Sequence, residues 1–175
     1  MLHLRPWHLD DLQSLAHHAN NLKIAACLTD AFPHPYTHAH AQAYINNATN
    51  EAATAYILAI DVHGQAVGSI GIHPQADIHR KNAELGYWLS EEYWGQGILP
   101  KIIPQMVSLA FARLDIDRIF ARPFGSNARS MRVLEKSGFV LEARFEKTLI
   151  KFGRLEDELV YAVRRNTWNH ALPIH

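Results

Sequence analysis

Ala83-Glu-Leu-Gly-Tyr-Trp-Leu89 is the most informative segment for the fold. It is followed directly by Ser90-Glu-Glu-Tyr-Trp-Gly-Gln-Gly-Ile-Leu-Pro-Lys101. The first segment predicts a strand, Gly95-Gln-Gly97 predicts a turn, and apolar residues at helical spacing then continue to Leu114. A glycine turn that opens a helix presents unpaired backbone N–H groups, which favour an anionic ligand. Taken alone, this pattern leaves two interpretations open: a cradle for a diphosphate, or a tight strand-to-helix connection.

Strands and helices alternate on both sides of this segment. Further strands are predicted over Leu2–Arg5, Ala55–Asp61, Ala66–Ile72, Arg118–Phe124, Val140–Lys151 and Leu155–Arg164. Helices are predicted over Asp10–Leu28, with Asp10 or Asp11 as cap and a break at Asn20-Asn21, over Thr37–Asn46, and from a cap at Ser126 or Asn127 to Ser137. Because the helices fall between strands, they should cover both faces of a mixed sheet in an α/β (α+β) domain.

Length and charge restrict the classes of protein to consider. The chain has 175 residues, 48% of them apolar, which predicts one domain over residues 1–175. Lys plus Arg and Asp plus Glu both number 17, so the formal charge is zero, which argues against broad nucleic-acid binding. The sequence contains no run of 18 apolar residues, so no membrane span is expected, and the first residues do not resemble a secretory signal. We therefore expect a cytoplasmic protein that does not bind membranes.

Metal binding has little support in the sequence pattern. The twelve histidines are scattered, and the densest runs are His17-His18 and His34 with His38 and His40. No HExxH motif and no cysteine pattern accompany them, so no metal site is expected. The single cysteine, Cys27, excludes a disulfide within the chain and is interpreted as a structural thiol.

Three segments together resemble one known family. Gly86-Tyr-Trp-Leu89, Tyr93-Trp-Gly-Gln-Gly97 and Asn127-Ala-Arg-Ser-Met-Arg-Val-Leu-Glu-Lys-Ser-Gly-Phe139 are similar to the GNAT acetyltransferases. Within that superfamily, the resemblance is to the branch of the ribosomal-protein N-terminal alanine acetyltransferases, and it extends over nearly the whole chain. It implies the GNAT fold: a mixed, mostly antiparallel sheet of about seven strands, splayed between the fourth and fifth, with helices on both faces.

The resemblance also implies a site for acetyl-CoA. The pantetheine arm would pair with the backbone of Trp88 and Leu89, and Asn127 would reach the same arm. The pyrophosphate would sit on the turn formed by Gly95, Gln96, Gly97, Ile98 and Leu99. Arg132 is a candidate for contact with the 3′-phosphate. Leu99 and Pro100 depart from the family loop, and Pro104 should kink the following helix or delay its regular start.

The expected chemistry is direct transfer of the acetyl group to a primary amine. Backbone N–H near Trp88-Leu89 would stabilise the oxyanion. Glu84 is the candidate general base, and its alternative role is a strand-edge carboxylate paired with a basic side chain. Ser130 stands where the branch has a serine proposed to protonate the thiolate, and its alternative role is to satisfy N–H groups of a first helical turn.

The acceptor is left open by the sequence. A protein N-terminal α-amine is the first expectation, and an aminoglycoside or polyamine type of small amine is the alternative. A non-catalytic CoA-binding sensor or interaction module is a third possibility, raised by Leu99 and Pro100. The chain is expected to act as a monomer or homodimer.

Overall fold

The structure is a computed structural model that describes residues 1–50, 52 and 54–169. Its seven strands hydrogen-bond in the order β1-β2-β3-β4-β5-β7-β6. They are β1 Leu2–Arg5, β2 Tyr56–Val62, β3 Gln65–Pro74, β4 Asn82–Leu89, β5 Arg118–Ala121, β6 Val140–Lys151 and β7 Arg154–Arg164. The helices are α1 Leu12–Ala19, α2 Leu22–Ala25, α3 His38–Ala48, α4 Ile98–Arg113 and α5 Ala128–Lys136. None of the helices in this described part of the chain combines the length and the apolar character that a membrane span requires.

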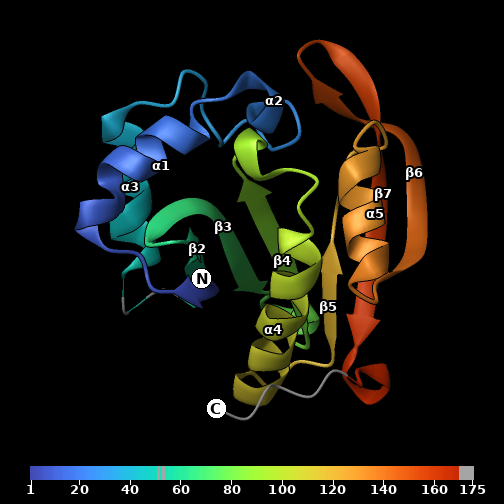
Figure 1. Cartoon of the computed structure of the whole chain (residues 1–175). Helices are drawn as coiled ribbons and strands as arrows, with labels where there is room; N and C mark the ends of the chain where they lie inside the picture. Colours follow the sequence, from blue (N-terminus) through green and yellow to red (C-terminus); the bar gives the residue numbers. More distant parts are fainter. Residues whose placement is uncertain (51, 53, 170–175) are drawn as a thin grey trace. The chain divides into compact units, whose positions relative to one another are not determined.

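Two compact units divide the chain, one formed by residues 1–71 and 86–98 and the other by residues 72–85 and 99 onward. In the first unit, β1 pairs with β2 in antiparallel register, and α1 lies beside α3 (Figure 1). Aromatic and aliphatic side chains from these helices and strands form its core. That core includes Trp7, Leu15, Ile24, Tyr36, Ile45, Ile57 and Trp88.

A buried ion-pair network joins β1 to β2 and to the start of α1. Arg5 donates through Nη1 and Nη2 to the two carboxylate oxygens of Asp11, both at 2.7 Å, and through Nε to Asp61 at 2.7 Å. Asp11 also accepts from the backbone N–H of His8. The predicted cap is therefore wrong in detail: Asp11 occupies the N-cap position of α1, but its side chain makes no capping bond there because Arg5 and His8 use it.

The first predicted helix is broken where its sequence indicated. A short 3-10 turn over Leu9–Asp11 precedes α1, which ends at Ala19, and α2 follows after Asn20 and Asn21. The side chain of Asn21 caps α2 by accepting from the backbone of Lys23, and the side chain of Asn20 accepts from Tyr36 N–H. The predicted Thr37 cap of α3 is confirmed, since its hydroxyl accepts from His40 N–H at 3.3 Å.

In the second unit, the start of β4 pairs with β5 in parallel, from Asn82↔Arg118 to Glu84↔Phe120. β5 pairs with β7, which forms the closing hairpin with β6. Strand β5 ends at Ala121 rather than at the predicted Phe124, because Pro123 has no N–H to continue a ladder. Helix α5 lies against the β6–β7 hairpin (Figure 1), and Tyr161 of β7 donates to Glu135 of α5 at 2.9 Å.

Helix α4 contains two prolines and still begins immediately after the glycine turn. Pro100 falls in its first turn, where a missing N–H is tolerated, and Pro104 lies inside the helix. The expected delay of the helix start is therefore wrong. The other end of α4 is held by Arg165, whose guanidinium donates to the carbonyls of Phe111, Leu114 and Ile116.

Candidate functional site

The glycine turn before α4 has the backbone conformation that its sequence predicts. Gly95 and Gly97 have φ values of +77° and +70°, a region that L side chains rarely adopt. A Cβ added to either glycine would meet no atom within 4 Å, so the space above the turn is open. Ile98, by contrast, is buried and anchors the turn to the protein. The turn can therefore offer backbone groups to a ligand without crowding from side chains.

Two side-chain contacts fix this turn to the structure before it. The indole Nε1 of Trp94 donates to the carbonyl of Leu89 at 2.8 Å, which ties the turn to the end of β4. The side chain of Gln96 donates back to the carbonyl of Glu92 at 3.0 Å. Trp94 thus has a structural role, because it holds the turn against the end of β4.

The backbone at the end of β4 has a defined orientation. Ser90 N–H donates to the carbonyl of Val67 in β3, and backbone groups alternate in direction along a strand, so Leu89 faces away from β3. The register that joins β4 to β5 stops at Glu84↔Phe120, whereas β4 continues to Leu89. Gly68 of β3 permits close packing here, because a Cβ at that position would lie 2.6 Å from the carbonyl of Trp88.

The side chain of Trp88 belongs to the core of the first unit. It stacks edge-on with Phe32, whose ring also contacts Tyr36. Tyr44 lies in the same group, and its hydroxyl is 2.7 Å from Ser69 Oγ. Burial raises the pKa of both Tyr36 and Tyr44, so these phenols stay protonated at neutral pH. The indole of Trp88 is thus part of the core, and by the same alternation its backbone groups face β3, so of the two predicted strand-end contacts only Leu89 faces away from β3.

The predicted residues of α5 lie at its N-terminus in the second unit. Asn127 caps the helix, because its Oδ1 accepts from the backbone N–H of Ser130 at 3.1 Å. Ser130 is half-buried in the first turn, and Arg132, two residues further on, is exposed. The capping choice left open between Ser126 and Asn127 is thus settled for Asn127.

Glu84 forms an ion pair on the second unit. Arg122 donates from Nε and Nη2 to its two carboxylate oxygens, at 3.0 and 2.9 Å, and from Nη1 to Glu158 at 3.4 Å. The hydrogen bonds to Glu84 raise the pKa of Arg122, which keeps the guanidinium charged. This contact is the one that the alternative, structural role of Glu84 requires.

His73 is the titratable group next to this ion pair. Gln75 N–H donates to the carbonyl of Asn82. His73 lies two residues before Gln75, and Glu84 lies two residues after Asn82. Burial lowers the pKa of His73 below 6.5, and the charge of Glu84 opposes the shift only in part. The imidazole is therefore neutral near pH 7.

Within each unit, the structure brings some predicted site residues together. Trp88 and Leu89 adjoin the turn in the first unit through Trp94, and Asn127 and Ser130 share a helix start in the second. Sequence reasoning missed Arg122. The parallel pairing of the strands around Glu84 and Phe120 could have indicated it, because Arg122 follows Phe120 by two residues.

A family model of the acetyltransferase (GNAT) domain matches residues 1–140. The chain belongs to this GNAT family. The GNAT resemblance that the three sequence segments carried is thereby confirmed.

Individual GNAT proteins add detail. The uncharacterized N-acetyltransferase YoaA of Bacillus subtilis (strain 168) is 35% identical over 99 residues, covering 57% of this chain and 55% of its own. YdaF of the same organism, provisionally named a ribosomal N-acetyltransferase, is 30% identical over 105 residues, covering 60% and 57%. The chain therefore spans little more than half the length of the curated relatives that it matches.

Solved GNAT structures confirm the fold. Mycobacterium smegmatis RimJ, solved in complex with CoA-disulfide, superposes with a TM-score of 0.83 at 18% identity, over 98% of this chain and 85% of its own. The mixed sheet with a parallel β4–β5 pair and helices on both faces is thus the GNAT fold, as expected.

Proposed function

We propose that the protein is an acetyl-CoA-dependent N-acetyltransferase and that residues 1–175 form one GNAT domain. The observation that carries the proposal is the turn before α4, where Gly95 and Gly97 hold positive φ and leave open space above the backbone. Such a turn at a helix start suits a pyrophosphate. Membership of the GNAT family supplies the reaction class.

The orientation of several backbone and side-chain groups supports the cofactor contacts that we propose. Gly95, Gln96, Gly97, Ile98 and Leu99 would bind the pyrophosphate through their backbone, since Ile98 is buried and the side chain of Gln96 bonds to Glu92. The predicted pairing of the pantetheine arm with the backbone of Trp88 and Leu89 would rest on Leu89, because the backbone groups of Trp88 face β3.

The remaining cofactor contacts would come from α5. Asn127 uses its Oδ1 for the helix cap, so its Nδ2 group would reach the arm. Arg132 is exposed and would meet the 3′-phosphate.

The transfer itself needs an oxyanion donor, a proton acceptor and a proton donor. Leu89 N–H faces away from β3 and would stabilise the negative oxygen that forms when the amine attacks the thioester carbonyl. Glu84, acting through a water, would accept the amine proton, and the neutral imidazole of His73 is the second candidate beside it. Ser130 would protonate the departing thiolate.

The protonation of the acceptor favours an α-amine. Deprotonating an α-amine with a pKa near 8 takes about 1.4 kcal/mol at pH 7, against about 4.6 kcal/mol for a lysine amine near 10.4. We therefore propose a protein or peptide N-terminus as the substrate class, with a small amine as the second candidate.

The test is an acetylation assay with purified protein, acetyl-CoA and peptides that carry both a free α-amine and an internal lysine. Mass spectrometry locates the acetyl group, and spermidine and an aminoglycoside are assayed in parallel. Acetylation at the α-amine alone supports the proposed acceptor. Transfer only to the small amines would contradict it. Acetyl-CoA binding without transfer to any amine would contradict the enzymatic role and favour a CoA-binding sensor.

A further inference from the structure

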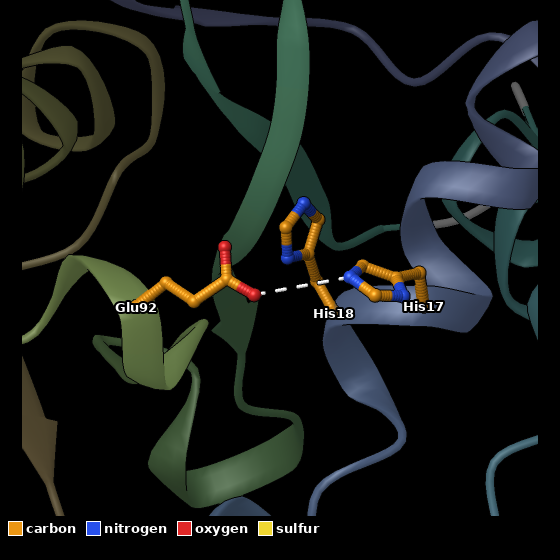
Figure 2. Close-up of side chains that lie close together, drawn as sticks. All are labelled: His17, His18 and Glu92. Carbon is orange, nitrogen blue, oxygen red and sulfur yellow. Dashed lines mark ion pairs between the residues drawn. The ribbon is translucent and has the colours of Figure 1, made fainter.

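Three potential metal ligands converge in the first unit, beside the segment that leads into the glycine turn. His17 and His18 lie in the last turn of α1, and Glu92 lies in the 3-10 turn η3, Glu91–Tyr93. One donor atom from each residue lies within 4.8 Å of the other two. Figure 2 shows the three side chains pointing toward one another, with Nε2 of His17 and Oε1 of Glu92 joined as an ion pair at 3.8 Å.

The two histidines converge although neighbouring residues of a helix normally point in different directions. Their rings lie 4.9 Å apart, centre to centre. His18 is buried, and its Nδ1 lies 3.0 Å from Ser90 Oγ, which fixes the ring. A hydrogen bond to a ring nitrogen is the usual way in which a protein fixes the orientation of a histidine ligand.

From this arrangement we infer that His17, His18 and Glu92 form a binding site for Zn²⁺. Two imidazoles and one carboxylate are a ligand set that zinc accepts, with water in its fourth position. Hard cations such as Mg²⁺ prefer oxygen ligands only and should not bind here. Nothing in the proposed acetyl transfer depends on this site.

The geometry requires a small adjustment of exposed groups only. Zinc–nitrogen bonds of about 2.0–2.1 Å in a tetrahedral site place two ligand atoms roughly 3.4 Å apart. The side chains of His17 and Glu92 are 70% and 65% exposed, so they can rotate by the remaining ångström or so, while His18 stays fixed. The site is therefore half-built: one rigid ligand and two that close around the ion.

The consequence of binding would be a second tie between η3 and the helices before it. Glu91 of η3 already accepts from Asn21 Nδ2 at 2.8 Å and pairs with Lys23. Zinc held by Glu92 would fasten the same turn to α1. A ligand that binds only the folded chain stabilises it, so the unfolding temperature should rise with zinc concentration.

The test uses the full chain after treatment with a chelator. Equilibrium dialysis measures bound Zn²⁺, and the absorption spectrum of added Co²⁺ reports the coordination geometry. The test variant carries His17→Gln and Glu92→Gln, both at exposed positions. The matched control carries His79→Gln and Glu146→Gln, which removes an exposed histidine and an exposed carboxylate elsewhere.

We expect one Zn²⁺ per chain, no comparable binding of Mg²⁺, and the strong absorption of four-coordinate Co²⁺. The test variant should bind zinc at least tenfold more weakly and lose the cobalt spectrum, while the control keeps both. Equal zinc affinity in the test variant, or equal loss in the control, would overturn the site. A weak, six-coordinate cobalt spectrum in the unaltered chain would overturn it as well, whether or not the variants fold.

Discussion

Arg122 binds both carboxylate oxygens of Glu84, through Nε at 3.0 Å and Nη2 at 2.9 Å. In such a bidentate pair each carboxylate oxygen accepts one guanidinium N–H, and the two bonds hold the side chain in one orientation. Substitution can distinguish the two roles of Glu84, because removing a base and removing a structural partner of Arg122 have different effects on kcat.

Glu84→Gln should lower kcat by about a hundredfold if Glu84 accepts the amine proton, since a positioned base contributes roughly 10²–10⁴. Glu158→Gln is the matched control, because Glu158 contacts the same guanidinium at 3.4 Å. Steady-state kinetics at saturating acetyl-CoA measures both. Small and equal effects would make Glu84 a structural residue, and His73→Gln would then be the next variant to measure.

Ser130→Ala should lower kcat by about tenfold or more while the dissociation constant for acetyl-CoA stays unchanged. The physical reason is that the hydroxyl would act on the thiolate, which exists only during the reaction. Ser126→Ala, just outside α5, is the control and should have no effect. A change in acetyl-CoA affinity with normal kcat would assign Ser130 to the helix start alone.

Asp11→Asn should destabilise the protein by about 2 kcal/mol at pH 7, because Arg5 loses two charge-assisted hydrogen bonds to this carboxylate and keeps only its pair with Asp61. Burial alone would raise the pKa of Asp11, but the hydrogen bonds from Arg5 and from His8 N–H together lower it below 3.8. A lowered folded pKa means that this stabilisation is complete above the ordinary pKa and is lost as the pH falls through the folded one.

The measurement for Asp11 is urea unfolding of both proteins from pH 7 to pH 2.5. The difference in free energy should shrink on the acid side, once Asp11 of the unaltered chain begins to bind a proton. A difference that stays constant over this range would show that the pair does not supply the stability.

Sequence reasoning succeeded where the deciding interactions are local. The Thr37 cap, the break at Asn20-Asn21 and the glycine turn each depend on residues within a few positions of one another. Three predictions were wrong, for different reasons. Asp11 does not cap α1 because Arg5, on a strand, takes its carboxylate. Pro123 ends β5 early, and Pro104 is accommodated inside α4 without delaying its start.

Contacts between distant segments could not be read from the pattern. The partner of Glu84 is 38 residues away, and only the register of β4 on β5 brings Arg122 to it. His17 and His18 stood out as a pair in the sequence, but Glu92 gives them a third ligand only through the folded first unit. The expectation of no metal site rests on the spacing of residues along the chain, and this spacing does not show which side chains converge in the fold.

The most direct test of the central claim is calorimetric titration of the protein with acetyl-CoA, beside Gly97→Glu. That variant places bulk and negative charge in the open space above the turn, where the pyrophosphate would sit. Gly153→Glu is the control, since Gly153 has a similar φ of +73° and the same open surroundings in the β6–β7 hairpin. We expect micromolar binding that is lost in Gly97→Glu and kept in Gly153→Glu. Equal affinity in all three proteins, or no binding by the unaltered chain at millimolar acetyl-CoA, would contradict it.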